Sequence, residues 1–585
     1  MNSFYISNHF IIMSTCINNL ESGEVCRKML GFVRRTTKTS SRICSVNSLC
    51  YSIWRNEAVS SSNPDDSDFI QESVVPTFHF QASLPRLPIP RLDDTKRRFL
   101  NAFEPIASSN EEYESATKAI DEFVANEGRR LHDELVELNQ DNYSTPRRLD
   151  AYYTDRRSLV LTSNAAMVFE DDPRPEYNEQ LVRAAILLRS SLRFMNSVRK
   201  NVLEPTMFHA HPENSNTPFF KNFVSCVPSK LSWYPAHFLK ATPLDMSQFK
   251  QMFNSSRIPQ LGRDDFVTYD QAKHIIVTSK GSLYVFDVIK NNGSLALTSD
   301  IYRQLALISA HNPPASVPPV SVLTSEERDT WTVARKQLKA ANEDSLKLIE
   351  SAILCLCLDD DDTDNLNDAM RNFLHGNGQN RWFDKSMQLV INKRGLAAIH
   401  FGMSWANGLT IWRYMDDVYR DSLQSSFMPD SKTIDSGNPA FRIEFKLDSE
   451  LLGKIEVAKN RFEKRIADLS VRHVKCEKFG RNLIKAKKHH GDALSHLAML
   501  AAYYNAFGCF PSAAGHCSTA GFKSGRTELV RSLTREMGAV IKALWSGDER
   551  QLGDLVKKAS LKHVFLIREA RRGEVCSYLL RNGLR

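Results

Sequence analysis

The chain has 585 residues, of which 42% are hydrophobic and 25% are charged. This ordinary globular composition excludes a collagen-like, coiled-coil or largely disordered protein, and the length suits two large domains or three to four average ones. The net charge is +8, and because half of that excess lies in residues 1–63, the remaining body is too weakly basic to predict a nucleic-acid-binding face.

The first predicted segment is an N-terminal leader over residues 1–63. From Met29 onward it contains five basic residues, many Ser and Thr, and no acidic residue until Glu57, which is the composition of a mitochondrial transit peptide. Residues 1–28 contain two acidic residues and fit this pattern less well. We therefore expect the leader to start at Met29, or residues 1–28 to be an extension of the gene model. A disordered tail without a targeting role is the alternative.

Helical periodicity begins after the proline-punctuated entry Leu84–Pro90. Apolar spacing predicts helices over Lys96–Phe103 and Ala116–Leu138. Val182–Lys200 is predicted to be an amphipathic helix in which arginines alternate with Leu, Ile and Phe. We expect its basic face to be solvated, and a helix lying on a membrane surface is the alternative.

Two β-hairpins follow in the middle of the chain. One pairs His274–Thr278 with Leu283–Ile289, and the other pairs Met387–Ile391 with Leu396–Phe401. Strands and helices are mixed along the whole length, so the sequence predicts an α/β protein.

The eleven cysteines are scattered, and the closest pair, Cys355 and Cys357, lies in the strand-like apolar run Ala352–Leu358. No CxxC pair or Cys/His array has the spacing of zinc ligands, so the sequence predicts no metal site, and reduced thiols in an intracellular compartment are favoured. The acidic run Asp359–Asp362 is expected to be a solvated loop rather than a cation site, because nothing nearby supplies further fixed ligands.

The last strongly periodic segment is a helix over Asp492–Phe507, with Asp492 as its N-cap. Three lysines precede it, at Lys485, Lys487 and Lys488. Ammonium groups beside a helix N-terminus suit phosphate, because charge and backbone N–H donors converge there. Taken alone, this pattern favours a solvated lysine cluster.

Five blocks of the chain resemble the choline/carnitine acyltransferase family. The blocks are Leu84–Pro90, Pro243–Gln248, Phe253–Pro259, Asn380–Ser386 and Cys517–Glu528. The resemblance implies two CoA-dependent-acyltransferase-like α/β domains with an active-site tunnel between them, which carnitine enters from one side and CoA from the other. The implied parts are a helical segment over 75–145 that packs with the C-terminal domain, an N domain over 146–435 and a C domain over 436–585. The family continues well past this chain's last residues, so we expect the second domain to be truncated.

The resemblance also identifies the position of the catalytic base. Long-chain members carry Glu-His-Ser-Trp-Gly-Asp-Gly where this chain has Gly402–Gly408, so Met403 occupies the position of the catalytic His and Asn407 that of the acidic residue. A thioether accepts no proton near neutral pH, so Met403 cannot act as a general base. His400 lies three positions earlier on the same predicted strand, and odd spacing points it to the opposite face.

The implied carnitine pocket is partly altered. The family has Tyr-Glu-Ser before Cys517, and this chain has Ala514, Gly515 and His516. Thr527 matches the family's carnitine-contacting Thr, whereas Tyr578 aligns with the Arg that pairs with the carnitine carboxylate. A neutral phenol cannot replace a bidentate guanidinium.

The CoA face and a membrane-associating insert are better preserved. The resemblance implies that CoA is bound by Lys485, Lys487, Lys488 and Asp492. With the resemblance included, a CoA site is therefore favoured over a solvated lysine cluster. Residues 203–234 combine aromatic residues with lysines, and resemble the family's insert that docks on the mitochondrial inner membrane. Aromatic residues beside lysines suit a segment that lies at the membrane surface better than a helix that crosses the bilayer.

The resemblance therefore implies a protein of the matrix face of the mitochondrial inner membrane. Its activity would be the transfer of long-chain acyl groups between CoA and carnitine for fatty-acid β-oxidation. CoA and carnitine are substrates, so no cofactor, no metal and no nucleic-acid partner is expected. Met403, Ala514, Tyr578 and the expected truncation favour an alternative, a catalytically inactive paralogue that binds acyl-CoA. A mis-joined gene model is a third possibility.

Overall fold

The computed structural model describes residues 9–15, 67–314, 316–429, 439–475, 480–547 and 550–575. Most of the predicted leader lies outside the described residues. Its residues 9–15 form strand β1 (His9–Thr15), which pairs antiparallel with β13 (Leu469–Lys475). Within the described ranges, no helix combines the length and apolar character needed to cross a membrane.

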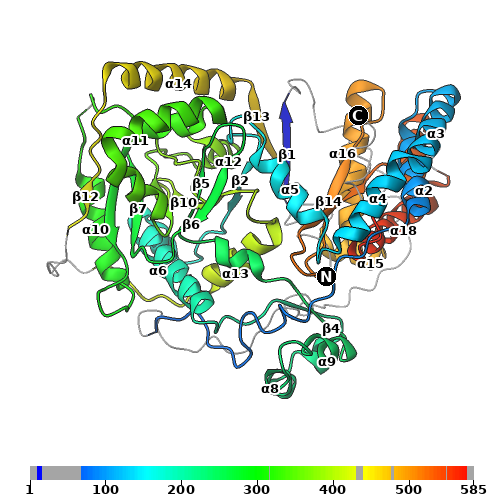
Figure 1. The fold of residues 1–585 in the computed structure, drawn as a ribbon, viewed down its shortest axis with the longest axis horizontal. Helices are drawn as coiled ribbons and strands as arrows, with labels where there is room; N and C mark the ends of the chain where they lie inside the picture. The colour runs from blue at the N-terminus through cyan, green and yellow to red at the C-terminus, as the bar shows by residue number, and fades with distance from the viewer. Residues whose placement is uncertain are drawn as a thin grey trace.

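A seven-stranded mixed sheet forms the centre of the larger part of the molecule (Figure 1), in the order β12-β8-β7-β9-β10-β11-β2. Strand β9 runs parallel to both of its neighbours, and the other adjacent strands are antiparallel. Both predicted hairpins are confirmed, as β7–β8 and β10–β11, and so is the mixed α/β class. The strands are β2 (Asn164–Val168), β7 (His274–Ser279), β8 (Ser282–Asp287), β9 (Cys355–Leu358), β10 (Met387–Ile391), β11 (Ala397–Gly402) and β12 (Phe441–Arg442).

Both faces of this sheet are buried under helices. Successive side chains of a strand point to opposite faces, so one strand contributes residues to both apolar clusters. In β7, for example, Ile275 and Val277 lie in one apolar cluster and Ile276 in the other. Helices α6 (Gln180–Arg199), α10 (Thr298–Ala310) and α13 (Gly408–Ser422) cover the first face. Helices α11 (Arg328–Ser351), α12 (Leu366–His375) and α14 (Ser449–Ala467) cover the second.

The prediction of a solvated basic face on α6 was wrong. Residues 182–195 of this helix are all buried, including Arg183, Arg189 and Arg193. Arg189 donates to the Asp68 carboxylate at 3.2 Å, and Arg193 pairs with the buried Asp421. The arginines are tolerated inside because each faces a carboxylate or a carbonyl oxygen, so the helix is a core element rather than a membrane-surface helix.

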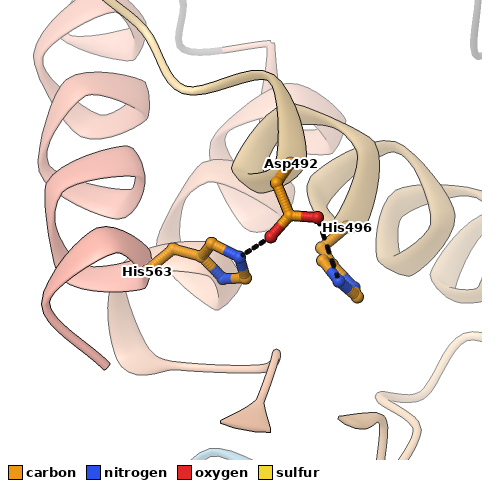
Figure 2. A group of neighbouring side chains, drawn as sticks. All are labelled: Asp492, His496 and His563. Atoms are coloured by element: carbon orange, nitrogen blue, oxygen red, sulfur yellow. Dashed lines mark hydrogen bonds and ion pairs between the residues drawn. The ribbon is translucent and has the colours of Figure 1, made fainter. Parts of the chain in front are cut away.

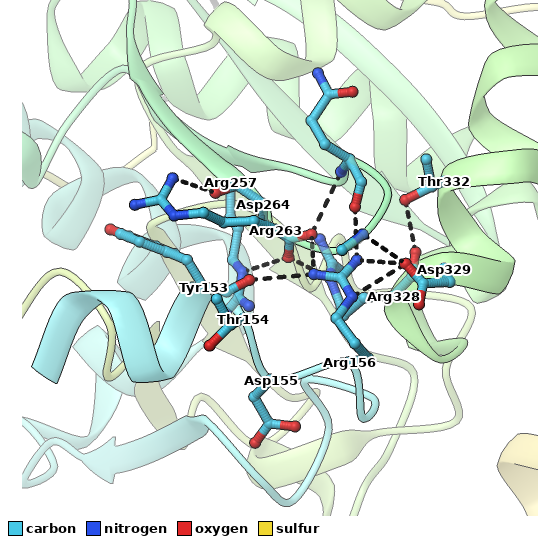
Figure 3. A network of polar contacts seen from close by, with 12 residues as sticks. Tyr153, Thr154, Asp155, Arg156, Arg257, Arg263, Asp264, Arg328, Asp329 and Thr332 are labelled. Carbon is cyan, nitrogen blue, oxygen red and sulfur yellow. Dashed lines mark hydrogen bonds and ion pairs between the residues drawn. The ribbon is translucent and has the colours of Figure 1, made fainter. Parts of the chain in front are cut away.

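A second ionic cluster centres on Asp264, whose side chain is fully buried. Its carboxylate accepts from Arg257 and Arg328 at 2.6 Å each and from Arg156 at 3.0 Å. Figure 3 shows these arginines converging from separate segments on the one acidic group. Asp329, at the edge of the cluster, pairs with Arg156 at 3.0 Å and is half exposed. The network ties the start of α11 to the segment between α5 and β2 and to the β5–β6 hairpin.

The acidic run after β9 is only partly a solvated loop. Asp359 is buried, and its two carboxylate oxygens accept from Arg381 at 2.8 and 2.7 Å. The expectation of a solvated loop was therefore wrong for Asp359, because this first residue still lies at the end of a buried strand. Cys355 and Cys357 point to the same face of β9, and their sulfur atoms lie 3.7 Å apart in the core.

A second group of elements surrounds a two-stranded ribbon, β14 (Ala514–Ser518) and β15 (Thr527–Arg531). Helices α15 (Arg481–Ala486), α16 (Gly491–Phe507), α17 (Arg535–Ser546) and α18 (Leu552–Arg571) accompany it. The N-terminal helices lie beside α16 and α18 in Figure 1, and Arg98 pairs with Glu569 of α18 at 3.0 Å.

These N-terminal helices are α2 (Leu92–Phe103), α3 (Asn110–Ala125), α4 (Glu127–Leu138) and α5 (Ser144–Tyr153). The predicted helix over Ala116–Leu138 is thus two helices. The break is at Asn126, which has a non-helical backbone conformation.

The remaining strands form small antiparallel pairs. Strand β3 (Met207–His209) pairs with β4 (Ala241–Pro243), and β5 (Ser255–Ile258) pairs with β6 (Asp265–Thr268). Between β3 and β4 lie α7 (Pro212–Ser215), α8 (Pro218–Ser225) and α9 (Trp233–Phe238). In Figure 1, α8 and α9 project from the body of the molecule.

Candidate active site

Met403 lies in the turn that leaves strand β11. Its backbone N–H donates to the Ser163 carbonyl at 2.8 Å, and its side chain packs against the apolar cluster on the α6 side of the sheet. Two residues on, the buried Trp405 donates from its ring nitrogen to the Ser386 carbonyl at 2.8 Å. These hydrogen bonds hold the turn in one conformation, even though its first residue is Met403 and not a histidine.

Asn407 is the N-cap of helix α13. Its side-chain oxygen accepts from the Thr410 N–H at 3.0 Å, and its own N–H donates to Gln248 at 2.9 Å. The resemblance implies only the loss of a charge at this position. The Asn–x–x–Thr spacing before an apolar helix is a capping signal that would have revealed this second role.

His400 faces away from Met403, as the strand alternation predicts. The ring lies against Phe383 at 5.7 Å between centroids, and Gln388 bonds to its Nδ1 at 3.0 Å. Burial lowers the pKa of His400 to about 3, so the ring is neutral at physiological pH. Its contacts lie on the face of the sheet that α11 and α14 cover. His400 therefore cannot act as the general base that Met403 fails to supply.

Arg526, one residue before the ribbon strand β15, holds the turn that contains Met403. Its guanidinium donates to the carbonyls of Met403 and Ser404 at 2.8 Å each and to that of Ala406 at 3.1 Å. Burial lowers the pKa of Arg526 to about 10, so it keeps its charge at neutral pH. The resemblance points only to the neighbouring Thr527, although the turn and the ribbon meet through Arg526.

The predicted carnitine-pocket residues lie on one face of the ribbon. Ser518 pairs with Thr527 and His516 with Leu529, so His516 and Thr527 point to the same side. Arg148 of α5 donates to the Thr527 hydroxyl at 2.8 Å. His516 is exposed on this face of the ribbon. Ala514 begins the same strand, and Tyr578 lies outside the described residues. Arg148 carries no sequence signal that places it here.

The lysine cluster lies where the sequence predicts it, but Asp492 has a different role. Lys485, Lys487 and Lys488 are exposed at or just after α15. Helix α16 begins at Gly491 with His490 at its N-cap position, so the prediction that Asp492 caps this helix was wrong. Asp492 lies one residue inside the helix, and its carboxylate accepts from His563 of α18 at 2.7 Å.

Comparison with known proteins agrees with this architecture. The model of the Choline/Carnitine o-acyltransferase family matches residues 87–580. The chain is 38% identical over 539 residues to "Carnitine O-palmitoyltransferase 2, mitochondrial" of Xenopus tropicalis, covering 87% of this chain and 82% of that protein. The human protein of the same name is 38% identical over 526 residues, covering 88% and 80%. Human "Peroxisomal carnitine O-octanoyltransferase" is 28% identical over 489 residues, covering 79% and 73%.

Proposed function

The chain belongs to the choline/carnitine acyltransferase family of enzymes, and we propose that it binds a long-chain acyl-CoA and carnitine but transfers the acyl group very weakly. It would be a carnitine O-palmitoyltransferase-like protein of mitochondrial fatty-acid β-oxidation whose catalytic power is largely lost. The observation that supports the proposal is Met403, which the motif resemblance aligns with the family's catalytic His and which hydrogen bonds hold in the turn after β11.

The chemistry explains why one substitution matters so much. Acyl transfer from a thioester to the carnitine hydroxyl needs a base within hydrogen-bond reach of the attacking oxygen. A positioned base contributes about 10² to 10⁴ in rate, and the thioether of Met403 supplies none of it. The binding and positioning of substrates can survive this loss, which is why weak transfer rather than loss of binding is expected.

The test is carnitine-dependent consumption of palmitoyl-CoA by the purified protein, beside the Met403→His variant. We expect the unmodified chain to transfer the acyl group slowly and Met403→His to be faster by about 10² or more. The exposed Met428 provides the matched control, since Met428→His adds an imidazole away from the turn. Robust turnover by the unmodified chain would refute the proposal and establish a fully active transferase that uses another base.

We propose Arg148 as the partner of the carnitine carboxylate, in the role that Tyr578 cannot fill. Its guanidinium already lies 2.8 Å from the hydroxyl of Thr527, the residue that matches the family's carnitine-contacting Thr. A charge-assisted hydrogen bond contributes about 1.5–3 kcal/mol, so Arg148→Gln should weaken carnitine binding about 10- to 100-fold in calorimetry. The adjacent Arg147 bonds to the Tyr143 carbonyl, and Arg147→Gln is the control.

The CoA side of the proposal depends on the exposed lysines Lys485, Lys487 and Lys488 beside the N-terminus of α16. Charge and free helix N–H groups favour the CoA phosphates there. Replacing all three with Ala should weaken palmitoyl-CoA binding, and by more at low salt than at high salt. The exposed Lys347 on α11 supplies the control variant Lys347→Ala, which should bind normally. Equal affinity in both variants would contradict the assignment.

The membrane side of the proposal depends on the projecting helices α8 and α9. Three aromatic side chains there are largely exposed: Phe219 at 77%, Tyr234 at 63% and Phe238 at 81%. Exposed aromatic rings suit the headgroup region of a bilayer, which supports peripheral association with the matrix face of the mitochondrial inner membrane. The double variant Phe219→Ser/Phe238→Ser should lose sedimentation with cardiolipin-containing vesicles. Leu261→Ser, at an exposed apolar residue elsewhere, should not.

We also propose the two-domain arrangement of the family, with a tunnel between the domains that passes the turn of Met403 at its centre. The seven-stranded sheet with its helices would form one domain, and the ribbon with α15–α18 the other. The contact of Arg526 with the Met403 turn supports this, because it lies where the two groups of elements meet. The predicted boundary between the N and C domains, at residue 435, lies outside the described residues. Strand β12 and helix α14 come after it in the chain, yet β12 belongs to the seven-stranded sheet and α14 covers one of its faces.

A further inference from the structure

Three potential metal ligands converge beneath the ribbon, at the start of α16. Asp492 and His496 are one helical turn apart on α16, and His563 comes from α18. One ligand atom of each residue lies within 4.8 Å of the others. Figure 2 shows the two imidazoles on either side of the Asp492 carboxylate. We propose that these three side chains form a Zn²⁺ site.

The spacing of the ligand atoms suits a small tetrahedral ion. Bonds of about 2.0–2.1 Å place the ligands of such an ion about 3.4 Å apart. The Asp492 oxygens lie 2.7 Å from Nε2 of His563 and 3.9 Å from Nε2 of His496. These distances bracket the required value, so the site can form by small side-chain rotations. Two imidazoles and one carboxylate are donors that Zn²⁺ accepts, with a fourth position left for water.

The surroundings leave the imidazoles available as ligands. His563 is buried, and its Nδ1 has no hydrogen-bond partner among the described residues. Without a metal, Nε2–H of His563 donates to Asp492. Since Nδ1 has no partner, the ring can carry its hydrogen on Nδ1 instead, which leaves the Nε2 lone pair to bind a metal. On the other side, a Cβ at Gly515 would lie 2.8 Å from Nε2 of His496. Glycine at this position of β14 is what leaves room for that ring at the cluster.

The sequence predicts no metal site, because these ligands are not close together in the chain. His563 lies 71 residues after Asp492, and only the packing of α18 against α16 brings them into contact. A bound ion would link these two helices beneath the ribbon. The face of the ribbon that carries His516 and Thr527 points away from the cluster, since Gly515 and His516 alternate along β14. Asp492 is shared with the CoA face that the resemblance implies, and Zn²⁺ binding measured without CoA tests the inference apart from the proposed function.

The experiment is Zn²⁺ binding to the full chain, prepared without a polyhistidine tag and freed of metal by chelation. Calorimetry should show one site, and Co²⁺ as a spectroscopic probe should give the intense visible bands of a tetrahedral ion that Zn²⁺ displaces. His496→Gln should weaken binding by more than about tenfold, since even loss of an outer-shell partner costs about 10- to 100-fold. His516→Gln, on the opposite face of the ribbon, is the matched control and should bind as the unmodified chain does.

His563→Gln tests the second imidazole, and circular dichroism shows whether this buried substitution still folds. If it does not fold, the partly exposed His496 decides the question alone, because its side chain is 17% accessible. Loss of the site in His496→Gln with an intact site in His516→Gln supports the inference. The absence of a stoichiometric site in the unmodified chain overturns it, and so does binding that His496→Gln leaves unchanged.

Discussion

Replacing Asp264 with Asn should destabilise the protein more than any surface charge substitution. The carboxylate is fully buried and accepts from three arginine side chains, Arg156, Arg257 and Arg328. Asn keeps the shape of Asp264 but loses the charge, and its NH₂ group then faces an arginine N–H donor. The change leaves buried guanidinium groups without their main counter-charge.

The size of the effect follows from that burial. Removing one partner of a buried ion pair costs about 3–5 kcal/mol, because the remaining charge stays desolvated. Arg328 retains one further carboxylate, Asp384 at 2.8 Å, so we expect a value near 4 kcal/mol rather than a larger sum over three pairs. A domain is stable by about 5–15 kcal/mol, so Asp264→Asn should remove a large fraction of that margin.

The assay is urea unfolding followed by circular dichroism, compared with Asp329→Asn. Asp329 belongs to the same network but is half exposed, so its loss should cost less than about 1 kcal/mol. The reasoning is refuted if the two variants unfold at the same urea concentration, because burial would then not govern the cost of losing a carboxylate here.

Further predictions concern other buried charges. Burial lowers the pKa of Lys385 to about 7. Since the unfolded chain binds this proton up to a much higher pH, the free energy of unfolding should rise from pH 7 to 9 by at most about 1.4 kcal/mol per pH unit. Lys385→Met should lack that rise, and identical pH profiles in urea titrations would contradict it. Asp421→Asn should cost about 3–5 kcal/mol, because the buried Arg193 would lose its counter-charge and keep only the Phe69 carbonyl, and a thermal melt detects this loss. Arg526→Met should make the Met403 turn exchange its amide hydrogens faster, and unchanged exchange would exclude a positioning role for Arg526.

Several features of the fold followed directly from the sequence. The hairpins β7–β8 and β10–β11 were predictable, because alternation of apolar residues and glycine-containing turns are local signals. The family blocks located Met403, whose chemistry can be judged from its side chain alone. The start of α16 was misplaced by one residue, since Asp492 resembles an N-cap until its partner His563 is known.

Long-range pairing could not be predicted in the same way. The arginines of α6 have the pattern of a solvated face, and only the packed structure shows Arg193 against Asp421, 228 residues away. Arg526 reaches the Met403 carbonyl across 123 residues. No local propensity encodes such a contact.

The sequence by itself thus determined the family, the α/β class and the absence of a basic side chain at position 403. The tertiary structure decided which charges are buried, what holds the Met403 turn, and that Asp492, His496 and His563 meet. The physical reason is that periodicity and side-chain chemistry depend on the residue and its neighbours. Desolvation and ion pairing depend on segments that packing alone brings together.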